Sequence, residues 1–200
     1  MDDLQRFSEV GAATGHLLEM GGEQSVIRKA VTADLDGIED TYREHFSHEK
    51  AHGAYTVFRE GVYPTRRDAQ RALDNGTLYV CVEEGSVLGS IILDARQPDE
   101  YGSIDWPSRA AGDRVRVIHL LMIRPASAGR GIGSALVNFA LETARRQGCE
   151  AVRLDTGAQN SPAASLYKKL GFQLAAVSSM RVGGEIAHRE HLFFEKMLGP

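Results

Sequence analysis

The segment from Ile123 to Ser134 has residue types and a spacing that suit the binding of an anion. Gly129, Gly131 and Gly133 alternate with larger residues where a strand is expected to end and a helix to begin. Glycines leave the backbone N–H groups uncovered, and the positive end of the helix dipole points at the same place. This combination predicts a site for a pyrophosphate group, with a flexible turn as the simpler interpretation.

Two common nucleotide-binding motifs do not match this segment. A Walker loop ends in Gly-Lys followed by Ser or Thr, and no such run is present here. A Rossmann fingerprint begins directly after its strand and has a third glycine farther on. Here Pro125 and other loop residues intervene, and Leu136 stands at the third position. The sequence therefore disfavours both kinds of nucleotide site.

Hydrophobic periodicity from residue 25 onward predicts the elements that position this segment. Apolar runs and alternation predict strands over 25–30, 78–82, 87–93, 115–123, 151–155, 172–180 and 188–196. Helical spacing and capping residues predict helices over 32–43, 65–75, 131–147 and 161–170. This order of elements predicts an α/β fold with a mixed sheet and helices on both faces.

Three segments fit this pattern less well. Residues 44–63 are polar and rich in His, Glu, Tyr and Gly, which predicts a loop or a broken helix. Residues 94–114 form a long polar connection of the kind that usually carries function. Residues 1–24 show a weak amphipathic helical pattern interrupted by glycines. We expect an N-terminal appendage over 1–24, either docked or frayed, and one domain over 25–200.

The composition is that of an ordinary globular domain, with 200 residues, 42% hydrophobic and 25% charged. The formal net charge of −4 disfavours a nucleic-acid partner, because proteins that grip phosphodiester backbones usually carry a basic excess. No apolar run is long enough to cross a bilayer, and the first residues do not match a signal peptide. Cys81 and Cys149 show no disulfide or metal spacing, so we expect a cytoplasmic protein without a membrane partner.

Two motifs, in this order, resemble those of the GNAT superfamily of N-acetyltransferases. The first is a hydrophobic strand, Arg-Pro at 124–125 and the run GRGIGSAL at 129–136. The second is LDT at 154–156 on a strand, then Asn160 and the run AASLYKKLGF at 163–172. The resemblance covers about residues 25–198. It implies a mixed, mostly antiparallel sheet of about seven strands that is splayed at its middle, with helices on both faces.

The resemblance implies acetyl-CoA as the cofactor. Its pantetheine arm is expected to enter the gap between the splayed strands and to pair with the backbone of Leu121, Met122 and Ile123, where one N–H group would also act as an oxyanion donor. Its pyrophosphate is expected at the glycine-rich loop. The cofactor-binding residues there are Ala128, Gly129, Arg130, Gly131, Ile132, Gly133 and Ser134. The family usually has Arg or Gln where Ala128 stands, so Arg130 or the neighbouring main chain is expected to compensate.

The resemblance also implies which groups move protons. An amine with a pKa near 10.4 must lose a proton before it attacks a thioester. Asp155 matches the position of a family base, and His119 on the preceding strand is the alternative. Tyr167 matches the family's general acid, and Asn160 is expected to bond the cofactor arm or loop backbone. Purely structural roles remain open for all four: an ion pair, a satisfied core histidine, core packing and a helix cap.

In this family the acceptor wall comes from the regions that correspond to residues 44–63 and 94–114. The candidate substrate-binding residues are Tyr55, Tyr63, Tyr101 and Trp106. Acidic groups accompany them at Asp99, Glu100 and Asp105, and acidic and aromatic groups together suit a cationic amine. Three histidines at 45, 48 and 52 lie near two glutamates, and His48 and His52 are one helical turn apart. No third ligand stands at a firm spacing from that pair, so no metal site is expected.

These expectations combine into one function. We expect an acetyl-CoA-dependent N-acetyltransferase that transfers the acetyl group directly to a primary amine of a small molecule or peptide. Because both cysteines lie outside the motifs, a covalent enzyme intermediate is disfavoured. A catalytically silent acyl-CoA-binding sensor or scaffold is the alternative. The resemblance also implies a possible homodimer, with the closing strands or residues 1–24 as contacts.

Overall fold

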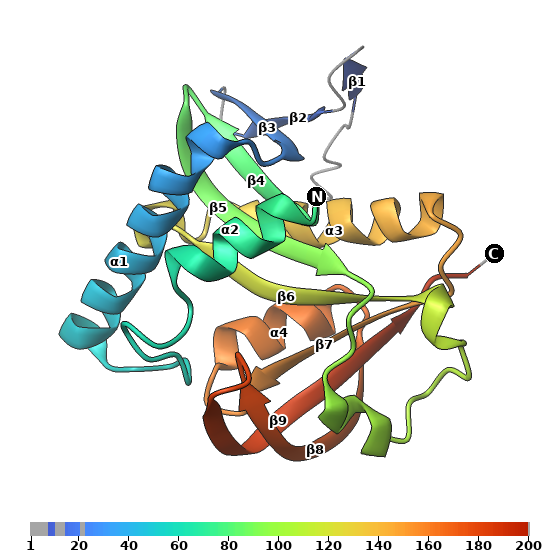
Figure 1. The fold of residues 1–200 in the computed structure, drawn as a ribbon. Coiled ribbons are helices and arrows are strands. Elements are labelled where there is room, and N and C mark those ends of the chain that lie inside the picture. Colours follow the sequence, from blue (N-terminus) through green and yellow to red (C-terminus); the bar gives the residue numbers. More distant parts are fainter. Residues whose placement is uncertain (1–7, 11–14, 21–22, 200) are drawn as a thin grey trace.

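The computed structural model describes residues 8–10, 15–20 and 23–199, and within them nine strands form one sheet in the order β1-β2-β3-β4-β5-β6-β7-β9-β8 (Figure 1). Neighbouring strands are antiparallel except β6 and β7, which are parallel. The strands are β1 (Ser8–Val10), β2 (Gly15–Met20), β3 (Glu23–Lys29), β4 (Leu78–Glu83), β5 (Ser86–Asp94), β6 (Val115–Ile123), β7 (Ala151–Gly157), β8 (Gln173–Val182) and β9 (Ile186–Met197). The predicted mixed, mostly antiparallel sheet is confirmed.

Two strands more than expected arise from the first 24 residues. The prediction of a helix there is wrong for residues 8–10 and 15–20, which form β1 and β2, and for 23–24, which begin β3. Residues 1–7, 11–14 and 21–22 lie outside the described residues. β2 pairs with β3, with Leu17 opposite Val26. The His16 ring packs edge-on against Phe139 of the helix behind, at 5.0 Å. The helical pattern was weak, and pairing with an available sheet edge overrides such local preferences.

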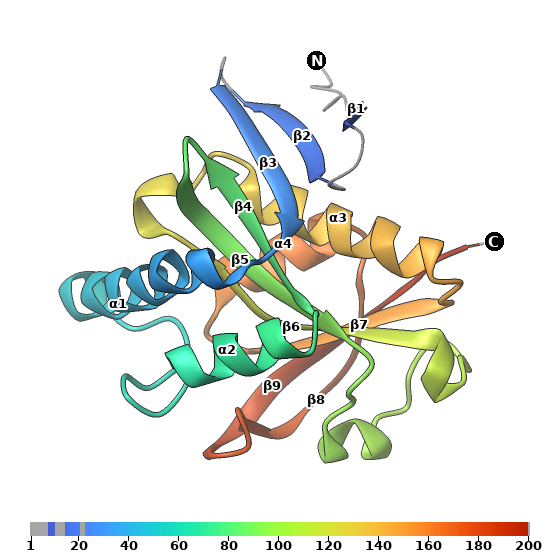
Figure 2. The same cartoon turned by 45° about the horizontal axis from the view of Figure 1, so that its top comes forward.

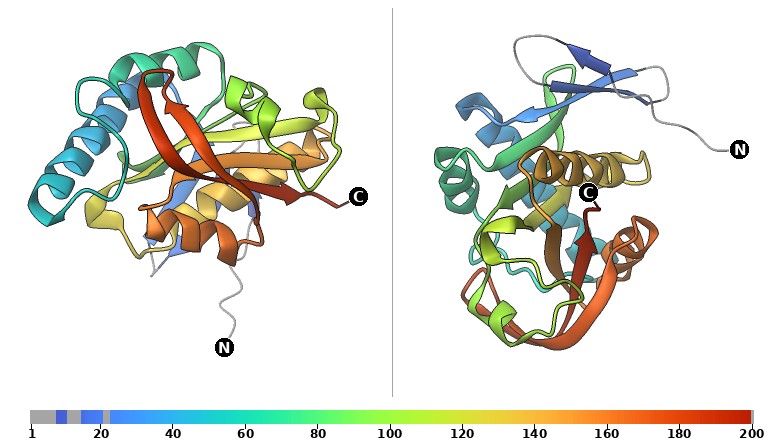
Figure 3. Two further views of the ribbon diagram at one scale, coloured as in Figure 1. Left: turned by 90° about the horizontal axis from the view of Figure 1, so that it is seen from below. Right: turned by 90° about the vertical axis from the view of Figure 1, so that its right-hand side faces the viewer.

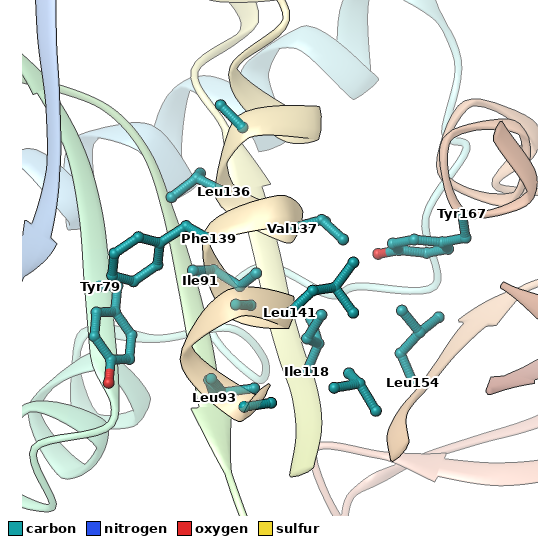
Figure 4. Packing of buried hydrophobic residues seen from close by; sticks show 14 of the residues in the cluster. Tyr79, Ile91, Leu93, Ile118, Leu136, Val137, Phe139, Leu141, Leu154 and Tyr167 are labelled. Atoms are coloured by element: carbon teal, nitrogen blue, oxygen red, sulfur yellow. The ribbon is translucent and has the colours of Figure 1, made fainter. Parts of the chain in front are cut away.

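Helices cover both faces of the sheet, as predicted (Figures 2 and 3). Helices α1 (Leu35–His52) and α2 (Arg66–Asp74) pack on one face, and α3 (Ile132–Arg146) and α4 (Ser161–Lys169) on the other. Strand β4 shows the alternation that makes this possible. Leu78 and Val80 face the α1–α2 core, whereas Tyr79 and Cys81 face the α3–α4 core, part of which Figure 4 shows.

The prediction of a loop or broken helix over 44–63 is wrong in its first part, because α1 continues unbroken to His52. Its polar composition hid a buried face. His45 and Glu49 are buried one turn apart, beside buried Phe46. Glu49 accepts hydrogen bonds from the backbone N–H groups of Tyr55, at 2.9 Å, and Thr56, at 2.7 Å. Burial of a carboxylate is tolerated here because the chain that follows the helix supplies its donors.

The long connection from 94 to 114 is ordered by short 3-10 turns, η2 (Asp99–Ser103) and η3 (Gly112–Arg114). Tyr101 is buried in a third apolar cluster with Val117 and Phe193. The Trp106 indole N–H donates to the Tyr101 carbonyl at 3.0 Å, and its ring lies 4.3 Å from the Arg153 guanidinium carbon. This connection therefore packs against β6 and β9.

No helix in the described part of the chain is long and apolar enough to cross a membrane.

The sheet opens between its two parallel strands. Register pairs join β6 to β7 only from Val115, opposite Ala151, to Val117, opposite Arg153. Beyond these pairs β6 runs on to Ile123 and β7 to Gly157, and the strands diverge (Figure 1). The register of β6 with β5 also shifts between Ser90 and Ile92. The expected splay is therefore present, and the edge of β6 that faces β7 has no paired strand from residue 118 onward among the described residues.

Candidate functional site

The glycine-rich loop has the backbone conformation that its sequence predicts. Gly129 and Gly131 have φ values of +79° and +82°, in the left-handed region that side chains disfavour. Gly131 is the residue from which α3 begins. A Cβ atom added at Gly129 would meet no other atom within 4 Å, so the surface there is open. The first turn of α3 thus presents backbone N–H groups to an open surface, which fits an anionic group.

Ion pairs fix the two ends of this loop. Arg124 pairs with Glu44 of α1 at 3.0 Å, and its Nε donates to the Val87 carbonyl at 3.0 Å. Arg130 pairs with Glu83 at the end of β4 at 2.7 Å. The Arg130 side chain therefore binds a carboxylate of the protein, and the main chain of the loop is the better candidate to compensate for Ala128.

Close approaches of neighbouring elements position the opening beside the loop. A Cβ atom on Gly89 of β5 would lie 2.8 Å from the Met122 carbonyl oxygen, and one on Gly133 would lie 3.3 Å from the Leu166 side chain of α4. The unpaired β6 segment that contains Leu121, Met122 and Ile123 runs directly into the loop. A free strand edge that leads to a glycine-rich helix start matches an extended cofactor arm that ends in a pyrophosphate. The residues present therefore fit acetyl-CoA.

Helix α4 places Asn160 and Tyr167 beside this opening. Asn160 caps the helix, and its Oδ1 accepts from the Ala163 N–H at 3.2 Å, so the capping role proposed for it is present. Tyr167 is 5% exposed and its ring lies 5.8 Å from Phe172 and 6.0 Å from Phe194. Figure 4 shows its hydroxyl directed from α4 toward Val137 and Leu141 of α3. Burial, and then the charge of Asp155, raise the pKa of this hydroxyl.

A cavity of about 740 Å³ lies beside β6, β7 and the start of α4. Its lining comes from the 56–63 segment, α2, the end of β5 with the connection after it, β6, β7 and the turn between β8 and β9. Both candidate bases, Asp155 and His119, are in the lining, as is Asn160. The structure thus brings three of the predicted site residues together at one cavity.

Asp155 lies at a nearly buried position, with 14% of its side chain exposed. The Tyr101 hydroxyl donates to its Oδ1 at 2.9 Å, and His191 Nε2 lies 3.6 Å from its Oδ2. Burial raises the pKa of this carboxyl above its ordinary value, although the Tyr101 hydrogen bond and the His119 charge act in the opposite direction. A carboxylate with a raised pKa that faces a cavity is a suitable proton acceptor.

His119 is oriented by groups that the sequence analysis did not identify. Its Nε2 lies 3.2 Å from Asp94 Oδ1 and 3.1 Å from the Arg96 carbonyl oxygen. Both neighbours are acceptors, so Nε2 carries a proton, and Nδ1 holds the lone pair whenever the ring is neutral. Burial raises the pKa of Asp94, but the hydrogen bond and charge of His119 outweigh it and the pKa is lowered. In the sequence, the only indication of a role for Asp94 was its position at the end of an apolar strand.

The four predicted substrate-binding residues have different positions. Tyr63 lines the cavity, and its ring packs against the turn between β8 and β9, where a Cβ on Gly183 would lie 2.5 Å away. Tyr55 lies outside the lining, beside His45. Tyr101 and Trp106 also lie outside it and support the wall from behind. Asp99 and Glu100 line the cavity and Asp105 does not.

The histidines of α1 do not form a metal site. His48 and His52 stack at 4.3 Å, and His52 Nδ1 lies 3.0 Å from the His48 carbonyl oxygen. His45 points instead toward Glu49 and Thr56. Within the described ranges, no group of three His, Cys, Asp or Glu side chains is arranged to hold a metal ion.

A family model described as the acetyltransferase (GNAT) family matches residues 35–172. The chain belongs to the GNAT acetyltransferase family. Acetyl-CoA is the cofactor of these enzymes, in agreement with the open β6 edge and the glycine-rich loop. The matched region begins with α1 and ends after α4, so it contains the loop, the opening and most of the cavity lining.

Two curated relatives are similar in sequence. An uncharacterised N-acetyltransferase of Methanocaldococcus jannaschii is 29% identical over 153 residues, which cover 74% of this chain and 60% of the relative. A mycothiol acetyltransferase of Cellulomonas flavigena is 30% identical over 114 residues, which cover 57% of this chain and 31% of the relative. The chain therefore spans between about a third and three fifths of the length of these relatives.

Solved structures share the fold. An acetyltransferase of the GNAT family from Streptococcus agalactiae superposes with a TM-score of 0.73 at 20% identity, covering 91% of this chain and 99% of the other. YncA of Salmonella typhimurium, solved with acetyl-CoA, superposes with a TM-score of 0.61 at 22% identity, covering 88% and 94%. At these identities the likeness concerns the fold alone.

Proposed function

We propose that this chain transfers the acetyl group of acetyl-CoA to a primary amine of a small molecule or peptide. The observation that carries the proposal is the opening between β6 and β7, where the free strand edge, the glycine-rich loop and the cavity with Asp155 adjoin. A cofactor in the opening would present its thioester to an amine in the cavity.

In this proposal, main-chain groups bind the cofactor. The unpaired edge of β6 at Leu121, Met122 and Ile123 offers N–H and C=O groups to an extended arm, and the start of α3 offers N–H groups to the pyrophosphate. A β6 N–H group directed at the thioester oxygen would supply about 3–4 kcal/mol to the transition state. When bound, acetyl-CoA supplies the activated acetyl group.

Asp155 is our candidate for the general base. It takes a proton from the amine nitrogen at Oδ2 or Oδ1. Because its pKa is raised, it lies closer to neutral pH than that of an ordinary aspartate, which suits a general base. His119 is the alternative, through its Nδ1. The two differ in the pH dependence of kcat/KM, because an acid limb set by Asp155 disappears in Asp155→Asn and persists in His119→Gln.

Tyr167 is our candidate for the general acid. Its raised pKa keeps the hydroxyl protonated at neutral pH, so Oη can release its proton to a departing thiolate. The ring is held by Phe172 and Phe194, which fixes where the hydroxyl can reach.

The cysteines support direct transfer. Both are buried, and burial raises the pKa of the Cys81 thiol to about 12, which leaves it a poor nucleophile.

The charge of the cavity supports a cationic or amine-bearing acceptor. Among its described lining residues, five are carboxylates and three are arginines. The carboxylates are Asp68, Asp94, Asp99, Glu100 and Asp155, and the arginines are Arg71, Arg96 and Arg181. A protonated amine that approaches such a lining is attracted and then loses its proton to a group inside it.

The test is release of coenzyme A from acetyl-CoA in the presence of polyamines, amino acids, peptides and aminoglycosides. At least one class is expected to accelerate release, and mass spectrometry is expected to show the acetylated product. Tight binding of acetyl-CoA without turnover on any amine would instead favour the silent acyl-CoA-binding module. Absence of heat on titration with coenzyme A would reject both.

A further inference from the structure

Strand β9 places two histidines in direct contact next to the proposed base. The Nδ1 atoms of His188 and His191 lie 2.8 Å apart, and the rings meet edge to face with centroids 4.7 Å apart. Two ring nitrogens at this distance share one proton, so one donates and the other accepts. His191 is 1% exposed, whereas His188 is partly open to solvent.

The other nitrogen of His191 faces Asp155. His191 lies opposite Gly157 in the β7–β9 register, and its Nε2 is 3.6 Å from Asp155 Oδ2. The second carboxylate oxygen, Oδ1, already accepts from the Tyr101 hydroxyl. Each oxygen of the proposed base therefore has its own neighbour with a donor, one from η2 and one from β9.

The protonation state of His191 follows from its surroundings. Burial, and then the charge of His188, lower the pKa of His191 to about 4, so the ring is neutral at neutral pH and carries one N–H. A lone pair on Nε2 would repel the carboxylate oxygen, whereas an N–H there would be attracted to it. With the proton on Nε2, Nδ1 accepts from the Nδ1–H of His188.

We propose that His191 is a positioning residue for Asp155 and that His188 fixes the tautomer of His191. This inference rests on the proposed function of Asp155 as the base. Donors on both carboxylate oxygens fix the plane of the carboxylate and favour its charged form. The 3.6 Å separation is long for a hydrogen bond, and such contacts commonly shorten when a substrate binds.

The charged and titratable groups around Asp155 come from four elements. Glu100 and Tyr101 of η2, His119 of β6 and Tyr167 of α4 surround it together with His191 of β9. Burial and Glu100 favour the protonated carboxyl, whereas Tyr101 and His119 favour the charged form. Loss of the His191 donor would shift this balance toward the protonated carboxyl, which cannot act as a base.

The first test compares His191→Leu, which has no donor, with His191→Asn, which keeps one. In His191→Leu the acid limb of kcat/KM is expected to move to higher pH, with activity on that limb about tenfold lower and acetyl-CoA affinity unchanged. His191→Asn is expected to retain most of the activity. His188→Leu is expected to move the limb in the same direction by less, and His52→Leu, at an exposed position on α1, not at all.

The second measurement does not depend on turnover. Titration of the Asp155 carboxyl by NMR in the wild type and in His191→Leu is expected to show a higher pKa in the variant. An unchanged acid limb or an unchanged Asp155 pKa overturns the inference, even if kcat falls. If His191→Leu does not fold, His188→Leu gives the same two comparisons at a partly exposed position. A shifted Asp155 pKa in a protein without turnover would reject the proposed function and keep the contact.

Discussion

The glycine-rich loop from 123 to 134 is one run of the chain, whereas the lining of the cavity around Asp155 comes from segments scattered between 56 and 191. In the loop the decisive features are positive φ angles at Gly129 and Gly131 and the start of α3. In the cavity they are contacts between distant side chains, such as Tyr101 with Asp155 and His119 with Asp94. Local chemistry thus suffices for the proposed anion site, and only folding assembles the proposed site for the acceptor.

The two regions also differ in what a substitution changes. Loop residues act through backbone geometry, so their replacement is expected to change cofactor affinity. In the proposed mechanism, cavity residues act through charge and proton transfer, so their replacement is expected to change turnover or acceptor affinity. A variant in one region that altered the parameter of the other would break this distinction.

The largest effect is expected from Asp155→Asn. Loss of the base should lower kcat/KM about 10²–10⁴-fold while acetyl-CoA affinity stays within about twofold. Steady-state kinetics and calorimetry measure the two quantities. Asp105→Asn removes an exposed carboxylate outside the cavity lining and is the matched control, with activity near that of the wild type. Equal activity of the two variants would exclude Asp155 as the base.

The same variant has a predicted effect on stability. Because the pKa of Asp155 is raised by folding, the carboxyl favours the folded state below its ordinary pKa, and this contribution is lost as pH rises through the raised value. Asp155→Asn should therefore have a higher Tm than the wild type at neutral pH, with the difference vanishing in acid. Thermal unfolding over a pH series tests this, and a lower Tm at neutral pH would contradict it.

The next effect is expected from Tyr167→Phe. Removal of the hydroxyl should lower kcat at least about tenfold and leave acetyl-CoA affinity nearly unchanged. Tyr79→Phe is the control, since Tyr79 lies in the same apolar cluster, on β4 (Figure 4). If both variants keep the wild-type rate, Tyr167 serves only in packing.

A pair of glycine variants compares the loop with a position of similar backbone geometry. Gly131 has a φ of +82° and Gly148, after α3, has one of +73°. Alanine at either position should cost about 1–2 kcal/mol of unfolding free energy. Only Gly131→Ala should also weaken acetyl-CoA binding, by about tenfold, as measured by calorimetry. Equal loss of affinity in both variants would show a general effect of strain.

The smallest effect is expected from Glu49→Gln, which acts on the cavity wall from outside. Burial raises the pKa of Glu49, but the backbone N–H groups of Thr56 and Tyr55 outweigh it and lower the pKa. Its contribution to stability is therefore present above its ordinary pKa and lost as pH falls through the lowered value. The variant should raise the acceptor KM about two- to fivefold by loosening the 56–63 segment.

Glu60→Gln is the control for that variant, because Glu60 forms an exposed pair with Lys50 at 2.6 Å. Exposed pairs contribute little, so its acceptor KM should not change. An increased KM for both variants would indicate that the charge of the segment matters more than its anchoring on α1.

Several predictions from the sequence depended on local signals, and these were confirmed. The start of α3 at Gly131 and the capping of α4 by Asn160 follow from residues within a few positions of each other. Predictions for 1–24 and 44–63 relied on equally local patterns. The predicted helix was wrong for residues 8–10 and 15–20, and the predicted loop or broken helix was wrong for residues 44–52. In the first segment, pairing of β2 with β3 decided the conformation. In the second, the buried Glu49 carboxylate, which accepts from the Thr56 N–H, decided it.

By itself the sequence determined the order of the elements from residue 25, the glycine-rich loop and the family resemblance. Each depends on periodicity or on residues adjacent in the chain. Only the tertiary structure decided that Tyr63 lines the cavity and Trp106 does not, that Asp94 orients His119, and that His191 faces Asp155. Those facts depend on contacts between strands and connections distant in sequence, which local patterns do not encode.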